Sequence, residues 1–136
     1  QDLEDAEGVP EAVANAKDAI AGADGLVIAT PEYNNGIPGV AKNAIDWLSR
    51  PPRDQSRVLA GKPVALVGSS AGQMGTATAQ AAWLPVLKAL RMKVFTTGGS
   101  IFVGSAHAAF NEDGELIDEA LSARLAGFLE AFVSSL

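Results

Sequence analysis

The sequence predicts an α/β fold in which helices cover both faces of a parallel sheet. Helix-like and strand-like patterns alternate along all 136 residues. The strand-like patterns are short continuous apolar runs, as expected for strands that are buried on both faces. This order predicts right-handed crossovers and a three-layer sandwich, which we expect residues 1–136 to form as a single domain.

The first half of the chain predicts two helices around one strand. Apolar residues at helical spacing, behind a proline suited to a first turn, predict a helix over residues 10–23. The apolar run over residues 25–30 predicts the first strand, which should be buried on both faces. A second helix is expected over residues 38–49, and it should end before Pro51 because proline disfavours a helical conformation in the preceding residue.

The second half continues the alternation. It predicts strands over residues 63–68 and 93–97, a helix over 76–90, and a last helix that begins at residue 118. Residues 100–103 should either extend or follow the third strand. A kink is expected at Pro85 because a proline inside a helix removes one hydrogen bond. Asp118 is a suitable cap for the last helix, and residues 111–114 form a turn.

Composition excludes several classes of protein. The net charge of −6 and the lack of a Lys- and Arg-rich run argue against binding to nucleic acids or anionic membranes. The absence of cysteine excludes disulfides, iron–sulfur clusters, thiolate zinc sites and a cysteine nucleophile. The chain has no apolar stretch of the ~18 residues that span a bilayer. Because residues 1–5 also lack an export signal, a soluble cytoplasmic domain is expected.

The edge of the predicted sheet presents a physical difficulty. The strand over residues 25–30 has the pattern of a central strand, yet only two clear strands follow it. A sheet of three parallel strands would leave a hydrophobic edge unpaired, which promotes aggregation. Either another chain covers this edge or further residues precede Gln1 in the protein, and we favour the second explanation.

Two loops of the predicted fold have the composition of ligand-binding segments. In open parallel sheets, ligands bind beyond the carboxyl ends of the strands. Residues 31–39 and residues 69–75 leave that end, and both are rich in turn formers and glycine. Glycine lets the backbone approach a flat heteroaromatic ligand closely. Spacing alone does not separate this interpretation from that of two ordinary strand–helix connections.

Residues 30–34, Thr-Pro-Glu-Tyr-Asn, followed by Ile-Pro-Gly at 37–39 and by residues 42–51, closely resemble the signature of the NADPH-dependent FMN reductase family. Residues 59–64 and the glycine-rich loop at 69–75 match this family in order and spacing. Its members include quinone, azo and chromate reductases of bacteria. The resemblance implies a flavodoxin-like fold with strand order 2-1-3-4-5, whose first two strands are absent here.

The resemblance also implies a site. It places one group of residues along the flavin ring and ribityl chain of FMN, and a second group on the other side: Pro31, Glu32, Tyr33 and Asn34, then Ser69, Ser70 and Gly72. It implies hydride transfer from NADH or NADPH through FMN to a quinone, azo, chromate or flavin acceptor, without a catalytic side chain or a metal. The FMN phosphate would be bound in a loop after the first strand, which this sequence lacks. A homodimer or homotetramer is expected, although Thr78 and Ala81 replace an Arg and a Tyr that help to hold a tetramer in some members.

Two other functions have partial support in the sequence. Residues 68–72 match the G-x-S-x-G pattern of α/β-hydrolases, but no acidic residue lies between Ser70 and the single histidine, His107. The order Ser, acid, His is therefore not met, and His107 is expected to be a surface or interface residue. The remaining alternative is a non-catalytic flavodoxin-like subunit that binds a partner, or forms part of a split assembly, and cannot hold FMN alone.

Overall fold

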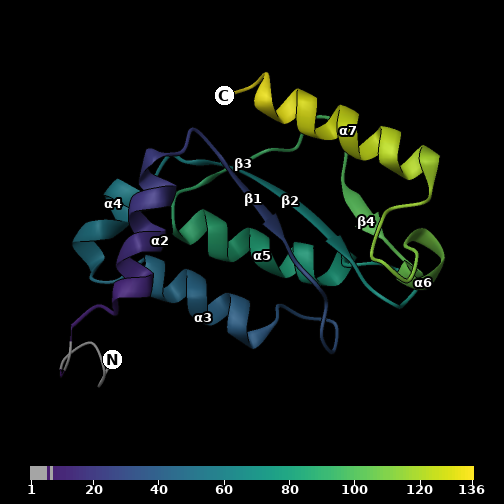
Figure 1. Cartoon of the computed structure of the whole chain (residues 1–136). Helices are drawn as coiled ribbons and strands as arrows, with labels where there is room; N and C mark the ends of the chain where they lie inside the picture. Colours follow the sequence, from purple (N-terminus) through teal and green to yellow (C-terminus); the bar gives the residue numbers. More distant parts are fainter. Residues whose placement is uncertain (1–5, 7) are drawn as a thin grey trace.

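The computed structural model describes residue 6 and residues 8–136, which form three layers, α/β/α (Figure 1). The strands are β1 (Leu26–Ala29), β2 (Pro63–Ser69), β3 (Lys93–Val94) and β4 (Ile101–Val103). The helices are α2 (Glu11–Gly22), α3 (Gly39–Leu48), η1 (Pro52–Asp54), α4 (Gln55–Val58), α5 (Ala77–Ala89), α6 (Ala106–Ala109) and α7 (Glu119–Val133). The four long helices, β1, β2 and β4 lie where the sequence predicts them. β3 is shorter than the predicted strand over residues 93–97, and the sequence pattern does not indicate the short η1, α4 and α6.

β2 is the central strand of the described sheet. β1 pairs with one side of β2 in parallel, with Leu26 opposite Val64. β3 and β4 both pair in parallel with the other side of β2, β3 near its start and β4 near its end. β4 therefore follows β3 on the same side of β2 and is separated from it by residues 95–100. The sequence leaves open whether residues 100–103 extend the third strand or follow it, and the structure shows that they follow it.

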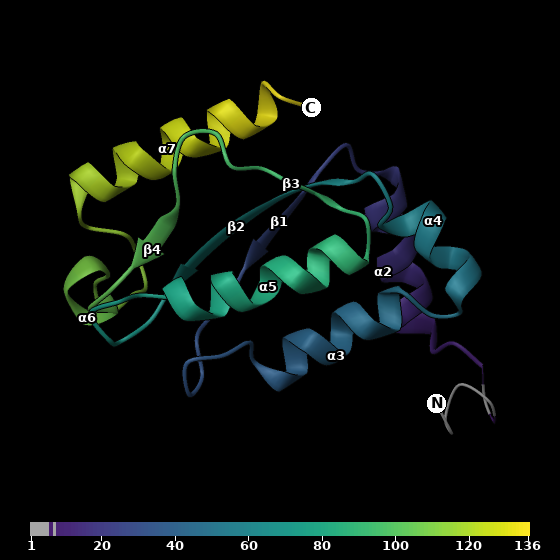
Figure 2. The ribbon, with the colours of Figure 1, turned by 180° about the vertical axis from the view of Figure 1, so that it is seen from behind.

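The helices divide between the two faces of the sheet. α7 covers one face, while α2, α3 and α5 cover the other (Figures 1 and 2). Phe128 and Phe132 of α7 are buried with Ala65 of β2, and the ring of Phe95 lies 5.4 and 5.3 Å from their ring centroids. The opposite core contains the fully buried Trp83 of α5. Each layer thus has its own apolar core against the sheet.

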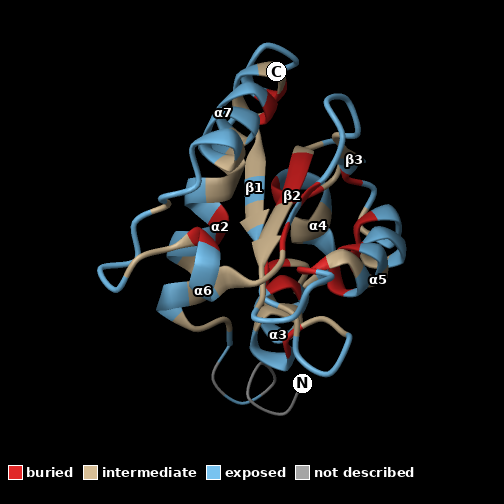
Figure 3. Cartoon of the chain, turned by 90° about the vertical axis from the view of Figure 1, so that its right-hand side faces the viewer, coloured by how far each residue is buried: buried red, intermediate tan, exposed pale blue. Residues whose placement is uncertain are grey.

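The prediction that the first strand is buried on both faces is wrong for this chain. Leu26 and Ile28 pack against the core under α3 and α5, but the side chain of Val27 is 42% exposed and Ala29 is exposed (Figure 3). Among the described residues β1 has one strand neighbour, β2, and the residues that α7 buries belong mainly to β2 and β4. The described part of the chain therefore covers Val27 only in part.

Helix boundaries follow local chemistry. Asp118 caps α7 as predicted, since its Oδ1 accepts a hydrogen bond from the backbone N–H of Leu121 at 3.0 Å. α5 continues through Pro85, and the kink expected there stays a prediction. None of the helices in the described part of the chain has the length and hydropathy needed to cross a membrane.

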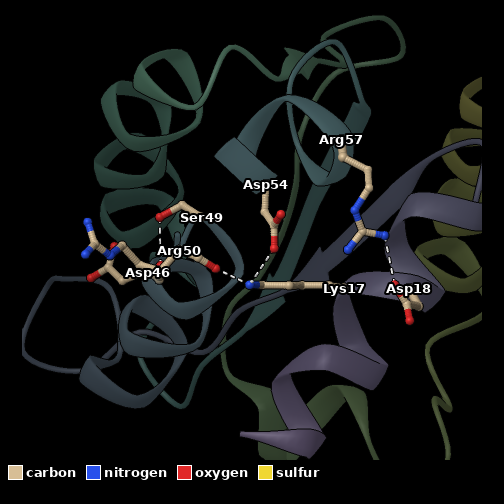
Figure 4. A network of polar contacts seen from close by, with 7 residues as sticks. All are labelled: Lys17, Asp18, Asp46, Ser49, Arg50, Asp54 and Arg57. Carbon is tan, nitrogen blue, oxygen red and sulfur yellow. Dashed lines mark hydrogen bonds and ion pairs between the residues drawn. The ribbon is translucent and has the colours of Figure 1, made fainter. Parts of the chain in front are cut away.

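A polar network connects α2 to residues 50–58, which precede β2 (Figure 4). Lys17 of α2 is 2% exposed, and its Nζ donates to the carbonyl of Arg50 and to Asp54 Oδ2, the latter at 3.2 Å. The neighbouring Asp18 accepts from Arg57 at 2.8 Å on the surface. The segments that lead into β1 and β2 are thus tied together by one buried and one exposed ion pair.

Candidate functional site

Two loops meet at the carboxyl edge of the sheet. The first loop, residues 30–38, follows β1, and the second loop, residues 70–76, follows β2. Because the two strands are parallel neighbours, both loops leave the same edge. The backbone N–H of Thr30 donates to the carbonyl of Val67 at 2.9 Å, so the pairing continues into the first loop.

Helix α5 fixes the start of the first loop. Thr30 is 2% exposed, and its Oγ1 accepts from Nε1 of the buried Trp83 at 3.2 Å while donating to the carbonyl of Pro31 at 2.8 Å. A buried indole N–H needs an acceptor, and this hydroxyl supplies it. The backbone direction at Pro31 is therefore set by a side chain from another layer.

Glu32 joins the first loop to the helix that follows the second loop. Its Oε2 accepts from the backbone N–H of Ala79 at 2.8 Å. Ala79 is the third residue of α5, so its N–H has no partner within the helix. A carboxylate is favourable there because of the helix dipole. Glu32, which the resemblance places along the flavin, thus makes an anchoring contact with one of its oxygens.

The first loop presents Tyr33 on a tight hairpin. Tyr33 and Gly36 exchange two backbone hydrogen bonds, of 3.2 and 3.0 Å. Asn34 and Asn35 between them have φ angles of 50° and 58°, as in a type I′ turn. Tyr33 is 61% exposed, and Pro31 and Asn34 are also exposed. The hairpin therefore holds an aromatic ring at the surface on a well-defined backbone.

The second loop is held against the segment that follows β4. Ser70 donates its backbone N–H to the carbonyl of Val103 at 2.9 Å and its Oγ to the carbonyl of Gly75 at 2.6 Å. The backbone N–H of Ser105 donates to the carbonyl of Gly72 at 3.0 Å. The exposed Gly72 therefore lies on a loop whose backbone is hydrogen-bonded to the end of β4 and to the segment after it.

Two glycines permit this close packing. A Cβ atom on Gly68 would lie 2.2 Å from the carbonyl oxygen of Thr30 and 2.3 Å from Oγ1 of Thr76. A Cβ atom on Gly104 would lie 2.1 Å from the carbonyl oxygen of Gln73. Both positions therefore require glycine, because a side chain would collide with backbone or with a fixed hydroxyl.

Ser69 carries a polar atom without a partner. It is the last residue of β2, and its buried Oγ has no hydrogen-bond partner among the described residues. Leaving a buried hydroxyl unsatisfied costs about 1–3 kcal/mol, so such groups usually have a partner. An atom of a ligand at the carboxyl end of β2 would supply one. This observation fits a bound group that offers hydrogen bonds.

The charge of the loops limits which part of a ligand they can hold. Residues 30–38 and 69–76 contain no Lys, Arg or His. A phosphate bound next to them would have only backbone N–H groups and hydroxyls as donors within these segments. Within the described residues, no group of three or more His, Cys, Asp or Glu side chains is arranged to hold a metal ion. The site suits the uncharged part of a ligand better than its anionic part.

The structure brings the predicted site residues to one edge of the sheet. Pro31, Tyr33 and Asn34 lie on the exposed side of the first loop, and Ser69, Ser70 and Gly72 lie at the end of β2 and in the second loop. The supporting contacts of Thr30 with Trp83 and of Glu32 with Ala79 were missed. A buried tryptophan signals that an acceptor is needed, but its partner lies 53 residues away in the sequence.

Comparisons with known proteins agree with this geometry. The family model described as NADPH-dependent FMN reductase matches residues 1–107. A curated relative, the NADH:(hydroxy)cinnamate reductase subunit of Vibrio ruber, is 40% identical over 130 residues, which cover 95% of this chain and 62% of that protein. A quinone reductase of Escherichia coli is 42% identical over 133 residues, covering 96% of this chain and 68% of that one.

A solved structure is also similar to this chain. The flavoenzyme NAD(P)H:(acceptor) oxidoreductase of Paracoccus denitrificans is 37% identical and superposes with a TM-score of 0.82, covering 98% of this chain and 71% of that chain. This chain thus spans less than two thirds of the Vibrio protein and slightly more than that of the other two. The chain belongs to the NADPH-dependent FMN reductase family and has its flavodoxin-like fold.

Proposed function

We propose that this chain forms the flavin-ring side of an FMN-dependent NAD(P)H oxidoreductase. The observation that carries the proposal is the meeting of the two loops at one edge of the sheet, beside the buried and unpartnered Oγ of Ser69. Because the chain spans only part of its relatives, the activity is proposed for the whole protein.

The two loops divide the binding of FMN between them. Pro31, Tyr33 and Asn34 would contact the ring and ribityl chain from the first loop, with Glu32 holding that loop on α5. Ser69, Ser70 and Gly72 would contact the cofactor from the other side, with Ser69 Oγ in a hydrogen bond to a polar atom of FMN. The phosphate would be held by residues outside both loops, since the loops contain no cationic side chain.

When bound, FMN would supply the redox chemistry, accepting hydride from NADH or NADPH and passing electrons to an acceptor. The residues of this chain would orient the cofactor and shape the slot beside it, and we assign no catalytic side chain. We place quinones first among the acceptors because the Escherichia coli relative is a quinone reductase. Azo compounds, chromate and free flavin stay in the proposal as further flat or small oxidants.

A second candidate is a subunit that needs a partner before it holds FMN. The observations that favour it are the exposed Val27 on β1 and the absence of a second strand partner for β1 among the described residues. The Vibrio relative is itself named as a subunit. A homodimer or homotetramer, and a cytoplasmic location, remain predictions for either candidate.

A titration of the purified whole protein with FMN separates the two candidates. Quenching of flavin fluorescence that saturates near one FMN per chain, followed by NADPH oxidation with a benzoquinone acceptor, is expected for the oxidoreductase. Binding that appears only after a chain supplying a first strand and its loop is added would favour the second candidate. If neither preparation binds FMN, both the site and the proposed reaction are wrong.

A further inference from the structure

A groove lies on the α5 side of the interrupted strand, separate from the two loops. This α5 groove has a volume of about 260 Å³ and apolar walls formed mainly by Leu66, Leu84, Phe95, Phe102 and Phe128. No residue of the first loop or of residues 69–76 lines it. Figure 2 shows the segment between β3 and β4 passing close to α7, away from the line that a continuous strand beside β2 would follow.

The groove also contains one buried side-chain amide. Gln80 lines it and is only 6% exposed. Its Nε2 donates to the carbonyl of Ile101 and to Oγ1 of Thr76, both at 3.0 Å. A carbonyl can only accept, so the nitrogen must face Ile101, and this fixes the position of the other amide atom. The Oε1 of Gln80 accepts no hydrogen bond from any residue that the structure describes.

The groove also exposes two large apolar side chains to water. Leu84 and Phe102 line it and are 47% and 38% exposed. A small apolar body in the groove would remove part of these side chains from water, which is favourable in proportion to the area covered. Ligand sites commonly combine such apolar walls with a few placed polar groups.

The size and chemistry define the class of ligand. An apolar cavity of about 150 Å³ is known to hold benzene, so about 260 Å³ leaves room for one aromatic ring with a small substituent. Thr96 and Ser100 also line the groove but are exposed to water, whereas Gln80 is its buried polar side chain. The free atom of Gln80 is an acceptor, so the ligand should offer a donor. We propose that the α5 groove binds a small hydroxyaromatic molecule, of the phenol or hydroquinone type, whose O–H donates to Oε1 of Gln80. This inference does not depend on flavin binding, because none of the loop residues takes part.

The test is an amide NMR titration of the intact chain with p-cresol and with 4-methylanisole, which has nearly the same shape but no O–H. We expect p-cresol to shift amides of residues 77–84 and 95–102, and 4-methylanisole to bind roughly threefold to tenfold more weakly, as the loss of one hydrogen bond to the Gln80 acceptor predicts. A matched pair of variants locates the site. Ala81→Leu adds bulk to an exposed lining position and should abolish binding, whereas Ala126→Leu, exposed on α7 and outside the groove, should not.

Three results would overturn the inference: equal affinity for the two probes, no saturable binding of p-cresol, or shifts confined to other residues. If a second copy of the chain covers the groove instead, p-cresol will not bind, and Leu84→Ser will lower the molecular mass found by light scattering. FMN titration of Ala81→Leu is an independent measurement. We expect the FMN affinity of this variant to be unchanged, so the experiment distinguishes an error in the proposed groove site from an error in the proposed flavin site.

Discussion

The region that leads into β1 and β2 and the region that follows them use polar groups in opposite ways. Before the strands, the buried ammonium of Lys17 donates to both the carbonyl of Arg50 and the carboxylate of Asp54. After the strands, Ser69 keeps a buried hydroxyl without a partner in the described chain, and Tyr33 is 61% exposed. The polar groups described before the strands hold the fold together. After the strands, Thr30 and Glu32 also hold the fold, but the Ser69 hydroxyl is left available to a ligand. The following variants test this difference.

The largest effect is expected at Lys17. Lys17→Met should lower the free energy of unfolding by about 2–4 kcal/mol, because it leaves Asp54 and the Arg50 carbonyl without their cation. Arg57→Met breaks the exposed ion pair with Asp18, the neighbour of Lys17 on α2. It should lower the free energy of unfolding by less than about 1 kcal/mol. Urea unfolding measures both. Equal losses would show that the buried pair has no special role.

The second largest loss of stability is expected for Gly68→Ala. The new methyl group would collide with Thr30 and Thr76, so we expect a loss of about 1–3 kcal/mol, as for other overpacked sites. Gly127→Ala on α7 has nothing within 4 Å and should stabilise the chain by up to about 1 kcal/mol. Thermal unfolding compares the pair. A neutral Gly68→Ala would mean that the two loops are less closely packed than described.

A smaller effect is expected at Glu32. Glu32→Ala removes the acceptor for the N–H of Ala79 and should lower stability by about 1 kcal/mol, in the range of lost helix caps. Glu32→Gln keeps an acceptor and should recover most of this loss. FMN titration of both variants completes the test. Unchanged stability with lost FMN binding would assign Glu32 to the cofactor and not to α5.

The smallest change in stability, with a change in binding, is expected at Ser69. Ser69→Ala removes an unsatisfied buried hydroxyl and should leave stability equal or raise it by up to about 1 kcal/mol, while FMN affinity falls several-fold. Ser122→Ala, on the exposed surface of α7, should change neither. A clear loss of stability in Ser69→Ala, with FMN affinity intact, would contradict the role that we give this hydroxyl.

The sequence predicted the parts of the fold that depend on local pattern. Apolar periodicity and prolines located α3 and α5 to within about a residue. The burial of β1 was predicted wrongly, because it depends on which elements lie beside Val27 in space and not on its neighbours in the chain. An apolar run indicates that a strand can be buried, but not that anything covers it.

The candidate site was predicted by motif and not by contacts. The two loops were identified from their residues and lie at one edge, as parallel strands require. The anchoring of Glu32 on Ala79 and the orientation of Gln80 were out of reach, because both depend on partners far away in the sequence. The α5 groove was likewise hidden, since its lining combines α5 with residues 94–100 and with Phe102 and Phe128.

The parallel pairing of this sheet has a consequence for how the chain folds. Leu26 pairs with Val64, and Pro63 pairs with Lys93, so no described strand pairs with a close neighbour in sequence. Each ladder must wait until a long connection has closed, and such non-local closure slows folding. Helices α3 and α5 lie within these connections, so their early formation would shorten the search. The order of assembly is therefore expected to run from the helices to the sheet, with the ligand edge completed only after β1, β2 and β4 are aligned.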